Sequence, residues 1–290
     1  MNKLNYEHVF NTLVKETAKY IYRNNLKAMV LGVSGGIDST VVAAICYEVS
    51  KQTGIPLIGR SLPIKNKGDE FNVSKLVGET FCNNFKCCSL SNIYSIVNTH
   101  IARAEVDENS GQTINTTPIS EGNIQARLRM IYLYNLASIY KGLVMSTDNQ
   151  TEYQLGFWTI HGDVGDFDPI QGLWKTEVYG LAEWLKDFYF IDGDDVHRAT
   201  AIEESIALTP TDGLGISNSD LDQIGAKSYY DVDRVLQALT CIAPPESHKL
   251  QDALIVELGL DVVSKIMQRH FNSRFKRLLS PITVPREMYD

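Results

Sequence analysis

The sequence predicts an α/β fold in which a doubly wound parallel sheet carries helices on both faces. Short apolar runs of strand length alternate along the chain with segments whose apolar residues recur every three or four positions. The first run ends in a Gly-containing loop, Ser34-Gly35-Gly36, which leads directly into a helical pattern. The composition, 44% hydrophobic and 21% charged, is that of a globular protein. Repeated alternation of strand and helix is typical of a parallel sheet with crossover helices.

The individual elements follow from the same patterns in chain order. The first is a helix over residues 6–23, in which Phe10, Leu13 and Ile21 share one face. The apolar run 28–33 predicts the first strand, and residues 40–49 after its glycines predict a helix. The pattern then predicts strand 56–62, helix 70–81, strand 85–90, helices 93–104 and 123–140, and strand 143–145.

Two long polar stretches without periodicity, residues 106–122 and 191–217, interrupt the alternation. Loops of this length in a compact protein are usually disordered or act as lids, so both are expected to be mobile. A helical tail over residues 261–290 carries several basic residues before a Pro-containing end. No repeat, low-complexity tract or clear linker is visible, and the chain is expected to form a single domain over residues 1–290.

Charge and apolar content argue against several classes of protein. Lys and Arg number 27 against 35 Asp and Glu, a net charge of −8, which is opposite to the basic surplus of a non-specific nucleic-acid binder. Any polyanion must therefore be held by local groups. The chain has no apolar run of 18 residues and no apolar stretch near its start, so no membrane association and a cytoplasmic location are expected. The five cysteines lack a Cys-x-x-Cys pair and are expected to be small buried apolar residues.

The sequence SGGIDS, residues 34–39, is the motif that carries chemistry. It joins a strand to a helix, where the free N–H groups and the positive end of the helix dipole favour an anion such as phosphate. The two glycines let the backbone fold its N–H groups into a concave nest. Asp38 would repel a phosphate unless a cation lay between them, so its presence predicts Mg²⁺. The alternative is a plain helix entry in which Asp38 is an acidic first-turn residue. Neither a Walker loop nor Gly-x-Gly-x-x-Gly is present.

The SGGIDS loop after a strand resembles the pyrophosphate-binding loop of the ATP pyrophosphatase (PP-loop) superfamily, whose members adenylate a carbonyl or carboxyl oxygen. Three further stretches, EGNIQARLRMIYLYNLA, STDNQTEYQLGFWTIHGDVGDFDPIQGLWKTEVYGLA and TPTDGLGIS, together resemble the NAD synthetase family. The resemblance runs from about residue 26 to 217 and continues more weakly to the end of the sequence. It implies an adenine nucleotide alpha hydrolase-like, Rossmann-like fold, a homodimer, and amidation of nicotinate adenine dinucleotide at the expense of ATP. The chain has no room for a glutaminase domain and so resembles the ammonia-dependent class.

The resemblance also implies roles for individual residues. ATP, the co-substrate, would be bound by Gly32, Val33, Ser34, Gly35, Gly36, Ile37, Asp38, Ser39, Thr147, Lys175 and Thr211. Asp38 and Glu152 would hold Mg²⁺. Arg127, Asp166 and Lys276 would bind the dinucleotide. Asp163 and Lys175 would be catalytic, with Asp163 positioning or deprotonating ammonia and Lys175 contacting ATP phosphate.

Several of these residues also have a structural interpretation. Asn149-x-x-Glu152 has the spacing of a capping box, and the two roles of Glu152 are compatible. A Lys at the start of a helix, like Lys175, is ordinarily solvated surface. Asp163 and Thr211 both lie in sequences that are typical of turns.

The substrate-binding residues depart from the family pattern in places. Arg127 and Arg129 lie about 200° apart on a helix, so only one can face a given ligand, and the resemblance favours Arg127. The family's spacing between Asp166 and the following proline is one residue longer. Ile160 stands where family members often have Lys, and Phe275 replaces a His, which puts substrate affinity or the exact substrate in question.

Two other functions remain open from the sequence. One is a different adenylating amidase or thiolase of the same superfamily, although thiolation needs a well-placed cysteine and the charge of −8 disfavours tRNA. The other is a nucleotide-binding homologue without turnover. Such a homologue would be expected to lose Asp38 or Glu152, and both are present.

Overall fold

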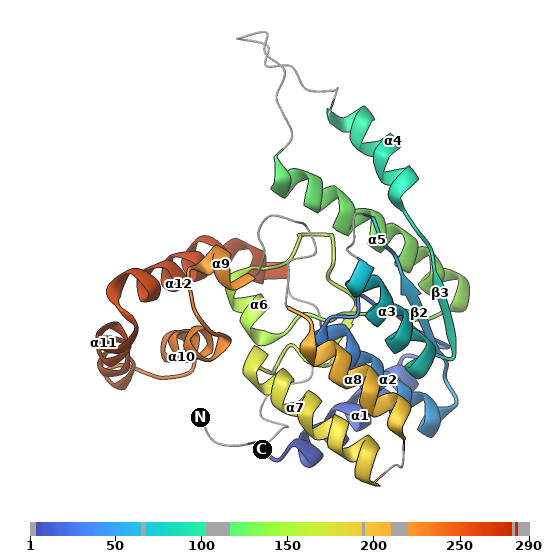
Figure 1. Ribbon diagram of the computed structural model, residues 1–290, viewed down its shortest axis with the longest axis horizontal. Helices are drawn as coiled ribbons and strands as arrows, with labels where there is room; N and C mark the ends of the chain where they lie inside the picture. The colour runs from blue at the N-terminus through green and yellow to red at the C-terminus, as the bar shows by residue number, and fades with distance from the viewer. Residues whose placement is uncertain are drawn as a thin grey trace.

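The strands of the described residues form one parallel sheet in the order β3-β2-β1-β4-β5-β6 (Figure 1). The computed structural model describes residues 4–64, 68–102, 117–192, 195–209, 220–279 and 282–283. The strands are β1 Met29–Gly32, β2 Leu57–Ser61, β3 Asn84–Cys87, β4 Leu143–Met145, β5 Phe167–Asp168 and β6 Ile282–Thr283. In register, Leu31 of the central strand β1 lies between Gly59 of β2 and Met145 of β4. This order is that of a doubly wound sheet and confirms the predicted fold class.

Helices cover both faces of the sheet. One face carries α1 Tyr6–Arg23, α2 Ile37–Thr53, α3 Gly68–Phe81, α7 Lys175–Asp187 and α8 Val196–Ala207. The other carries α4 Ser91–Ala102 and α5 Pro118–Tyr140. Successive residues of β1 point to opposite faces, so Met29 and Leu31 pack among the first group while Val30 packs with α5. Both faces are therefore apolar, which is why β1 reads as an uninterrupted apolar run.

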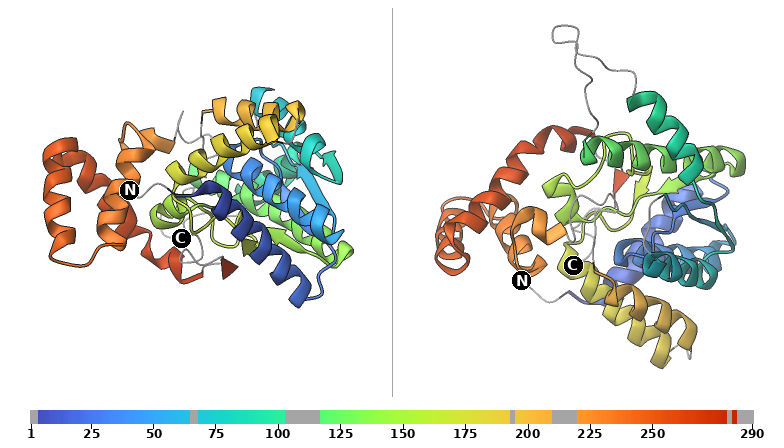
Figure 2. Two further views of the ribbon diagram at one scale, coloured as in Figure 1. Left: turned by 90° about the horizontal axis from the view of Figure 1, so that it is seen from below. Right: turned by 45° about the horizontal axis from the view of Figure 1, so that its top comes forward.

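A group of helices lies beside the sheet. It consists of α9 Asp220–Ile224, α10 Tyr229–Thr240, α11 Glu246–Leu258, α12 Leu260–Asn272 and the 3₁₀ helix Arg274–Leu279. Figures 1 and 2 show these helices to one side of the sheet in each view. Their apolar residues pack with Leu155 at the end of α6 Gln150–Leu155 and with Trp174, which precedes α7. The end of α6 and the start of α7 therefore pack against this helical group.

The predicted strands and most helices are confirmed to within a few residues. The tail 261–290, expected to be helical, contains strand β6 at Ile282–Thr283, because these residues pair with the sheet edge at β5. Two other differences lie in the stretches expected as mobile loops. In 106–122, the described part begins at Thr117, which caps α5 with Pro118 in its first turn. In 191–217, residues 196–207 form α8, with Asp195 as its N-cap. The remainder of both stretches, residues 193–194 included, is largely outside the described residues. No helix in the described ranges is long and apolar enough to cross a membrane.

The five cysteines are free thiols in different environments. Cys46 is fully buried, Cys82 and Cys88 are half-buried, and Cys87 and Cys241 are exposed. Burial raises the pKa of Cys46 and raises that of Cys82 to about 12. The expectation of buried apolar cysteines therefore holds for Cys46 and is wrong for Cys87 and Cys241.

Candidate active site

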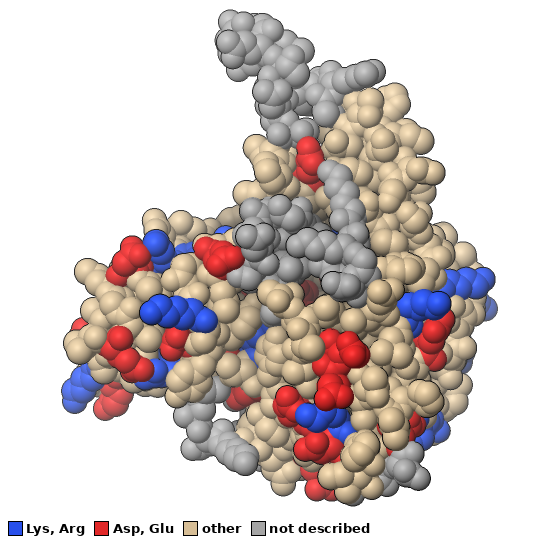
Figure 3. Space-filling model, in the orientation of Figure 1, with Lys and Arg blue, Asp and Glu red and all other residues tan. Residues whose placement is uncertain are grey.

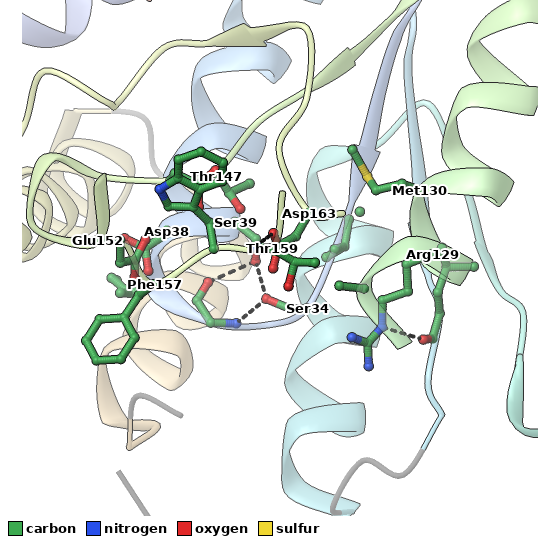
Figure 4. A pocket seen from close by; sticks show the side chains of 18 of the residues that line it. Ser34, Asp38, Ser39, Arg129, Met130, Thr147, Glu152, Phe157, Thr159 and Asp163 are labelled. Carbon is green, nitrogen blue, oxygen red and sulfur yellow. Dashed lines mark hydrogen bonds between the residues drawn. The ribbon is translucent and has the colours of Figure 1, made fainter. Parts of the chain in front are cut away.

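The candidate active site lies at the carboxyl ends of β1 and β4. The chain leads from β1 to β2 on one side of this strand pair and from β4 to β5 on the other. Such a switch point leaves a crevice at the carboxyl ends of the strands in doubly wound folds. The SGGIDS loop follows β1, and the segment with Thr147 and Glu152 follows β4. Both line a cavity of about 410 Å³. Figure 4 shows Asp38 and Glu152 side by side at one end, Asp163 and Thr159 near the middle and Arg129 at the other end (Figure 4).

The SGGIDS loop has the geometry of an anion-binding nest. Gly35 has a φ of 89°, a left-handed conformation that favours glycine. The N–H of Gly36 donates to the Ser34 hydroxyl at 3.2 Å, and the Ser34 and Ser39 hydroxyl oxygens lie 2.9 Å apart. Among the described residues no side chain caps the first turn of α2, so its N–H groups are available to an anion. The loop can therefore bind a phosphate through its backbone.

A serine from a distant helix holds the SGGIDS loop in place. Ser205 of α8 is 1% exposed, and its hydroxyl donates to the Gly35 carbonyl at 2.5 Å. Its oxygen also lies 2.6 Å from the hydroxyl of Thr40, which donates to the Gly36 carbonyl at 3.0 Å. Ser205 is not among the predicted site residues, because it lies in a stretch whose polar sequence favours a loop. No local signal connects it with the glycines 170 residues earlier.

Asp38, Glu152 and Lys175 meet at the mouth of the SGGIDS loop. The Lys175 side chain is only 2% exposed, and its Nζ lies 2.5 Å from Asp38 Oδ2 and 3.0 Å from Glu152 Oε1. Burial alone would lower the pKa of Lys175, but the two carboxylates raise it well above its ordinary value. Asn149 donates from Nδ2 to Asp38 Oδ1 at 2.8 Å. Lys175 is therefore a buried, paired cation and not the surface lysine that its position in the sequence favours.

Glu152 has a second contact that fixes its position. Its N–H donates to the Asn149 side chain at 3.0 Å, and its Oε2 accepts from the Asn149 N–H at 3.2 Å. This is the capping box predicted from the sequence. One carboxylate oxygen caps α6 while the other faces Lys175, so both interpretations of Glu152 apply together.

The two carboxylates around Lys175 suit a divalent cation. Asp38 and Glu152 both contact one ammonium group, so their carboxylates are close enough together to bind a single cation. Mg²⁺ usually takes one or two carboxylates together with phosphate oxygens and water. In the described part of the chain, no group of three or more His, Cys, Asp or Glu side chains forms a complete metal site. The donors present therefore fit a cation that arrives with a phosphate.

Three further carboxylates, Asp148, Asp163 and Asp168, lie on the segments that follow β4. Asp163 faces the cavity and accepts the Thr159 N–H at 2.7 Å, and its enclosed position raises its pKa. Asp148 accepts the Ser146 hydroxyl at 3.0 Å, and Asp168 accepts the Ile170 N–H at 3.1 Å. Burial raises the pKa of Asp148 and of Asp168 well above the ordinary value. The sequence analysis missed these last two, although Asp148 directly follows Thr147 at the end of β4.

The residues implied to bind the dinucleotide are separated. Lys276 lines the cavity and donates to the carbonyls of Gly156 at 2.7 Å and Trp158 at 2.5 Å. Burial lowers its pKa, whereas the Asp163 carboxylate opposes that change. The exposed Arg127 donates to the Ile160 carbonyl at 3.1 Å, outside the cavity lining.

Asp166 also lies outside the cavity lining. It accepts the Tyr134 hydroxyl at 2.9 Å and the Val144 N–H at 3.0 Å. Arg129, which the resemblance passed over in favour of Arg127, lines the cavity and donates to the Leu62 carbonyl at 3.2 Å.

The cavity thus brings together most of the predicted site. Its lining includes Gly32, Val33, Ser34, Gly36, Ile37, Asp38, Ser39, Thr147, Glu152, Asp163, Lys175 and Lys276. Thr211 lies outside the described residues. Arg269 of α12 also lines the cavity, which the sequence analysis did not anticipate.

Comparisons with known proteins give matches over most of the chain. A family profile described as NAD synthase matches residues 9–280. The NH(3)-dependent NAD(+) synthetase of Campylobacter jejuni is 33% identical over 214 residues, 73% of this chain and 75% of that protein. The protein of the same name from Pyrococcus furiosus is 30% identical over 282 residues, which cover 96% of this chain and 95% of the relative.

Solved structures share the fold. NMN synthetase from Francisella tularensis matches with a TM-score of 0.73 at 23% identity, over 96% of this chain and 98% of the other. NH3-dependent NAD synthetase from Campylobacter jejuni matches with a TM-score of 0.66 at 24% identity, over 94% and 96%. At these identities the likeness concerns the backbone arrangement.

Proposed function

This chain belongs to the NAD synthase family, and we propose that it amidates nicotinate adenine dinucleotide with ammonia, using ATP and releasing AMP and pyrophosphate. The observation that carries the proposal is the convergence of the SGGIDS loop with Asp38, Glu152 and Lys175 at the ends of β1 and β4. This arrangement offers an anion nest beside a charged cluster, which suits a triphosphate. A substrate such as ATP fits the expected cytoplasmic location.

The proposed reaction has two steps. A carboxylate oxygen of the nicotinate attacks the α-phosphorus of ATP, the bond from that phosphorus to the bridging oxygen breaks, and pyrophosphate leaves. Ammonia then attacks the acyl carbon, and AMP leaves with the bonding electrons. The free carboxylate is a poor acyl donor, whereas the acyl-adenylate has a good leaving group. The protein would accelerate the reaction by orienting the two substrates and by stabilising the charge that develops on the phosphate oxygens.

The SGGIDS loop is the proposed holder of the departing pyrophosphate. The N–H groups at the start of α2 and the Ser34 and Ser39 hydroxyls face the cavity. Lys175 can donate to phosphate oxygens once a cation takes over its contacts with Asp38 and Glu152. Thr147, at the end of β4, lines the same part of the cavity and is proposed to contact ATP.

Asp38 and Glu152 are the proposed ligands of Mg²⁺. When bound, Mg²⁺ would neutralise the charge that develops on the phosphate oxygens. Their approach to Lys175 and their partial exposure to the cavity support this assignment. Asn149 keeps the Asp38 carboxylate oriented toward the same point, independently of any cation.

Asp163 is proposed to hold ammonium and accept its proton. Its carboxylate faces the cavity, and its raised pKa makes it a better proton acceptor than an ordinary aspartate. Asp163→Asn should therefore reduce amide formation with ammonium strongly. Hydroxylamine is largely neutral near pH 7 and needs no such base, so the variant should keep most of its rate with that nucleophile. Equal losses with both nucleophiles would contradict the role as a base.

The apolar face of α4 and α5 supports a homodimer. Exposed apolar side chains line these two helices: Ile93, Ile96, Ile101, Ile119, Ile131, Tyr134 and Ile139. Helix α4 carries no Lys, Arg, Asp or Glu, and Figure 3 shows the surface over it almost without charge (Figure 3). Arg127 lies on the exposed side of α5, and Asp166 contacts Tyr134 on the same helix. A second copy on this face would therefore lie next to both residues that the cavity leaves out. Sedimentation of wild type and Ile131→Glu tests this assembly.

A mononucleotide acceptor is the second candidate. Ile160 and Phe275 replace side chains that could contact the second phosphate or the adenosine half of a dinucleotide, and Phe275 is 59% exposed. The neighbour from Francisella tularensis is named an NMN synthetase, and an amide-forming enzyme of that name would take nicotinate mononucleotide as its acid. The chemistry at the SGGIDS loop would be the same.

Product formation with purified protein tests both acceptors. Mg·ATP and ammonium are mixed with the dinucleotide, with the mononucleotide or with neither, and pyrophosphate and the amide are measured together. Equal amounts of pyrophosphate and NAD, dependent on the dinucleotide, are expected. A higher kcat/KM for the mononucleotide would favour the second candidate. Pyrophosphate release without either acid would indicate another adenylating amidase or thiolase, and no release at all would indicate a nucleotide-binding homologue.

A further inference from the structure

Helix α10 of the helical group contributes a buried carboxylate next to the active site. Asp233 is 0% exposed, although Tyr230 on the same helix is exposed and Tyr229 and Asp231 are half-buried. Within the described ranges, Asp233 forms no ion pair that would explain a carboxylate at this depth. Its contacts lie on the two segments that begin α6 and α7.

Both oxygens of Asp233 are used in binding these helices. Oδ1 accepts the hydroxyl of Thr151 at 2.5 Å. Oδ2 accepts the N–H of Thr176 at 3.0 Å and its hydroxyl at 2.7 Å. The Thr151 oxygen in turn accepts the N–H of Lys175 at 2.8 Å. A single carboxylate therefore fixes the first turn of α6 against the first turn of α7.

The two threonines are sequence neighbours of the charged cluster. Thr151 immediately precedes Glu152, and Thr176 immediately follows Lys175. A shift of either first turn would move Glu152 or Lys175 relative to Asp38, which comes from a different strand connection. Asp233 is thus placed to control the distances from Glu152 and Lys175 to Asp38, although it contacts none of these three side chains.

Helix α10 approaches the same cluster at a second point. The ring of Tyr229, the first residue of α10, lies 5.5 Å from Lys175 Nζ in a cation–π arrangement. Tyr229 and Asp233 are four residues apart and so lie on one face of the helix. This face is therefore part of the wall around Lys175.

We propose that Asp233 is a positioning residue for ATP activation. Through its hydrogen bonds to Thr151 and Thr176, it holds Glu152 and Lys175 at the correct distance from Asp38. The inference rests on the proposed function, because it assigns that cluster to Mg·ATP. Reactions of this kind depend on placement, and an error of about 1 Å in the reacting groups can cost about a hundredfold in rate. A fully buried acid that ties together two active-site turns is suited to prevent such an error.

The test compares Asp233→Asn with a matched control on the same helix. Asn has the same shape but places an NH₂ group against donors from Thr151 or Thr176. The control is Glu257→Gln, which breaks the exposed pair between Arg234 of α10 and Glu257 of α11. This control loosens the helical group at a contact away from Thr151 and Thr176. Both proteins are assayed well below their melting temperatures.

The expected result for Asp233→Asn is a kcat ten- to a hundredfold below wild type, with the KM for the acid substrate unchanged. The Mg·ATP dissociation constant, measured by calorimetry without the acid substrate, should rise. If only charge mattered, removing the Asp233 carboxylate near the phosphates would strengthen Mg·ATP binding. Weaker binding would therefore show that the positions of Glu152 and Lys175 have changed. Glu257→Gln should match wild type in both measurements.

If Asp233→Asn does not fold, Thr176→Val provides the same test, because it removes one donor and keeps the backbone bond. Folded variants whose kcat and Mg·ATP affinity both equal those of wild type would overturn the positioning role. A wild-type protein that binds Mg·ATP without turnover would refute the proposed function alone, because the affinity comparison would still decide the role of Asp233. A wild-type protein that does not bind Mg·ATP would overturn both.

Discussion

Replacement of Lys175 by Met is the most direct test of the charged cluster. Met has nearly the length of Lys and fills the same buried space without the charge. In the variant, Asp38 and Glu152 would face each other with no ammonium group between them, because both contact the same Nζ in wild type. The variant should therefore be less stable than wild type in the absence of divalent cations.

The size of the effect follows from the burial of the three groups. Removing one partner of a buried ion pair typically costs about 3–5 kcal/mol. The side chains of Asp38 and Glu152 are 15% and 18% exposed, so water offsets part of the loss and the lower end, about 3 kcal/mol, is expected. For a chain of this size, that corresponds to a melting temperature lower by about 6 °C.

Thermal unfolding in EDTA near pH 7 measures this loss directly. Lys186→Met, at the other end of α7, is the matched control, since its contact with Glu183 is a surface pair worth at most about 1 kcal/mol. Adding Mg²⁺ should raise the melting temperature of the Lys175 variant more than that of wild type, because the cation can take the place of the ammonium. A Lys175 variant that melts within about 1 °C of wild type would refute the reasoning.

Three other predictions follow from buried groups. Ser205→Ala removes the bond to the Gly35 carbonyl, worth about 1 kcal/mol, and should raise the KM for ATP roughly fivefold; an unchanged KM would show that the SGGIDS loop keeps its shape alone. Burial raises the pKa of Asp233 to about 6 in the folded protein. The contribution of Asp233 to stability is therefore greatest below its ordinary pKa and is lost as the pH rises through about 6. The unfolding free energy of wild type minus that of Asp233→Asn, from urea titrations, should fall by about 3 kcal/mol between about pH 4 and pH 7, and a constant difference would contradict this. In the native protein, thiol labelling followed by mass spectrometry should modify Cys87 readily and Cys46 only after unfolding; early labelling of Cys46 would contradict its burial.

The sheet could be predicted from the sequence because its strands are buried on both faces. A run such as Met29–Gly32 is then apolar throughout and stands out from the amphipathic segments around it. Helix α8 was harder to predict, because its buried residues include the small side chains Ala199, Ala201 and Ser205. Such residues give only a weak helical pattern of hydrophobicity. The start of α5 did carry a signal, because Thr117 followed by Pro118 is a typical helix entry.

The same distinction applies to the site. SGGIDS is a contiguous motif whose chemistry depends on local backbone geometry, so six residues were enough to predict a phosphate nest. The surroundings of Lys175 depend on Asp38, 137 residues away, and no local pattern predicts the burial of an isolated lysine. Asp233 and Ser205 act through contacts of the same long-range kind. The local geometry of a contiguous motif was therefore predictable from the sequence, whereas the distant side chains that hold it in place were not.

The charge of the cavity explains how a protein of net charge −8 could hold a triphosphate. Lys175 supplies no surplus positive charge, because Asp38 and Glu152 already match it. The attraction for a phosphate therefore comes first from the N–H groups of the SGGIDS loop. Arg129 and Lys276 also line the cavity, where their positive charge is shared with the Asp163 carboxylate. A triphosphate that approached Asp38 and Glu152 without a divalent cation would meet repulsion at its phosphate end. If Asp38 and Glu152 hold Mg²⁺ as proposed, ATP binding should depend on that cation, and Lys175 would keep the two carboxylates together until the cation binds.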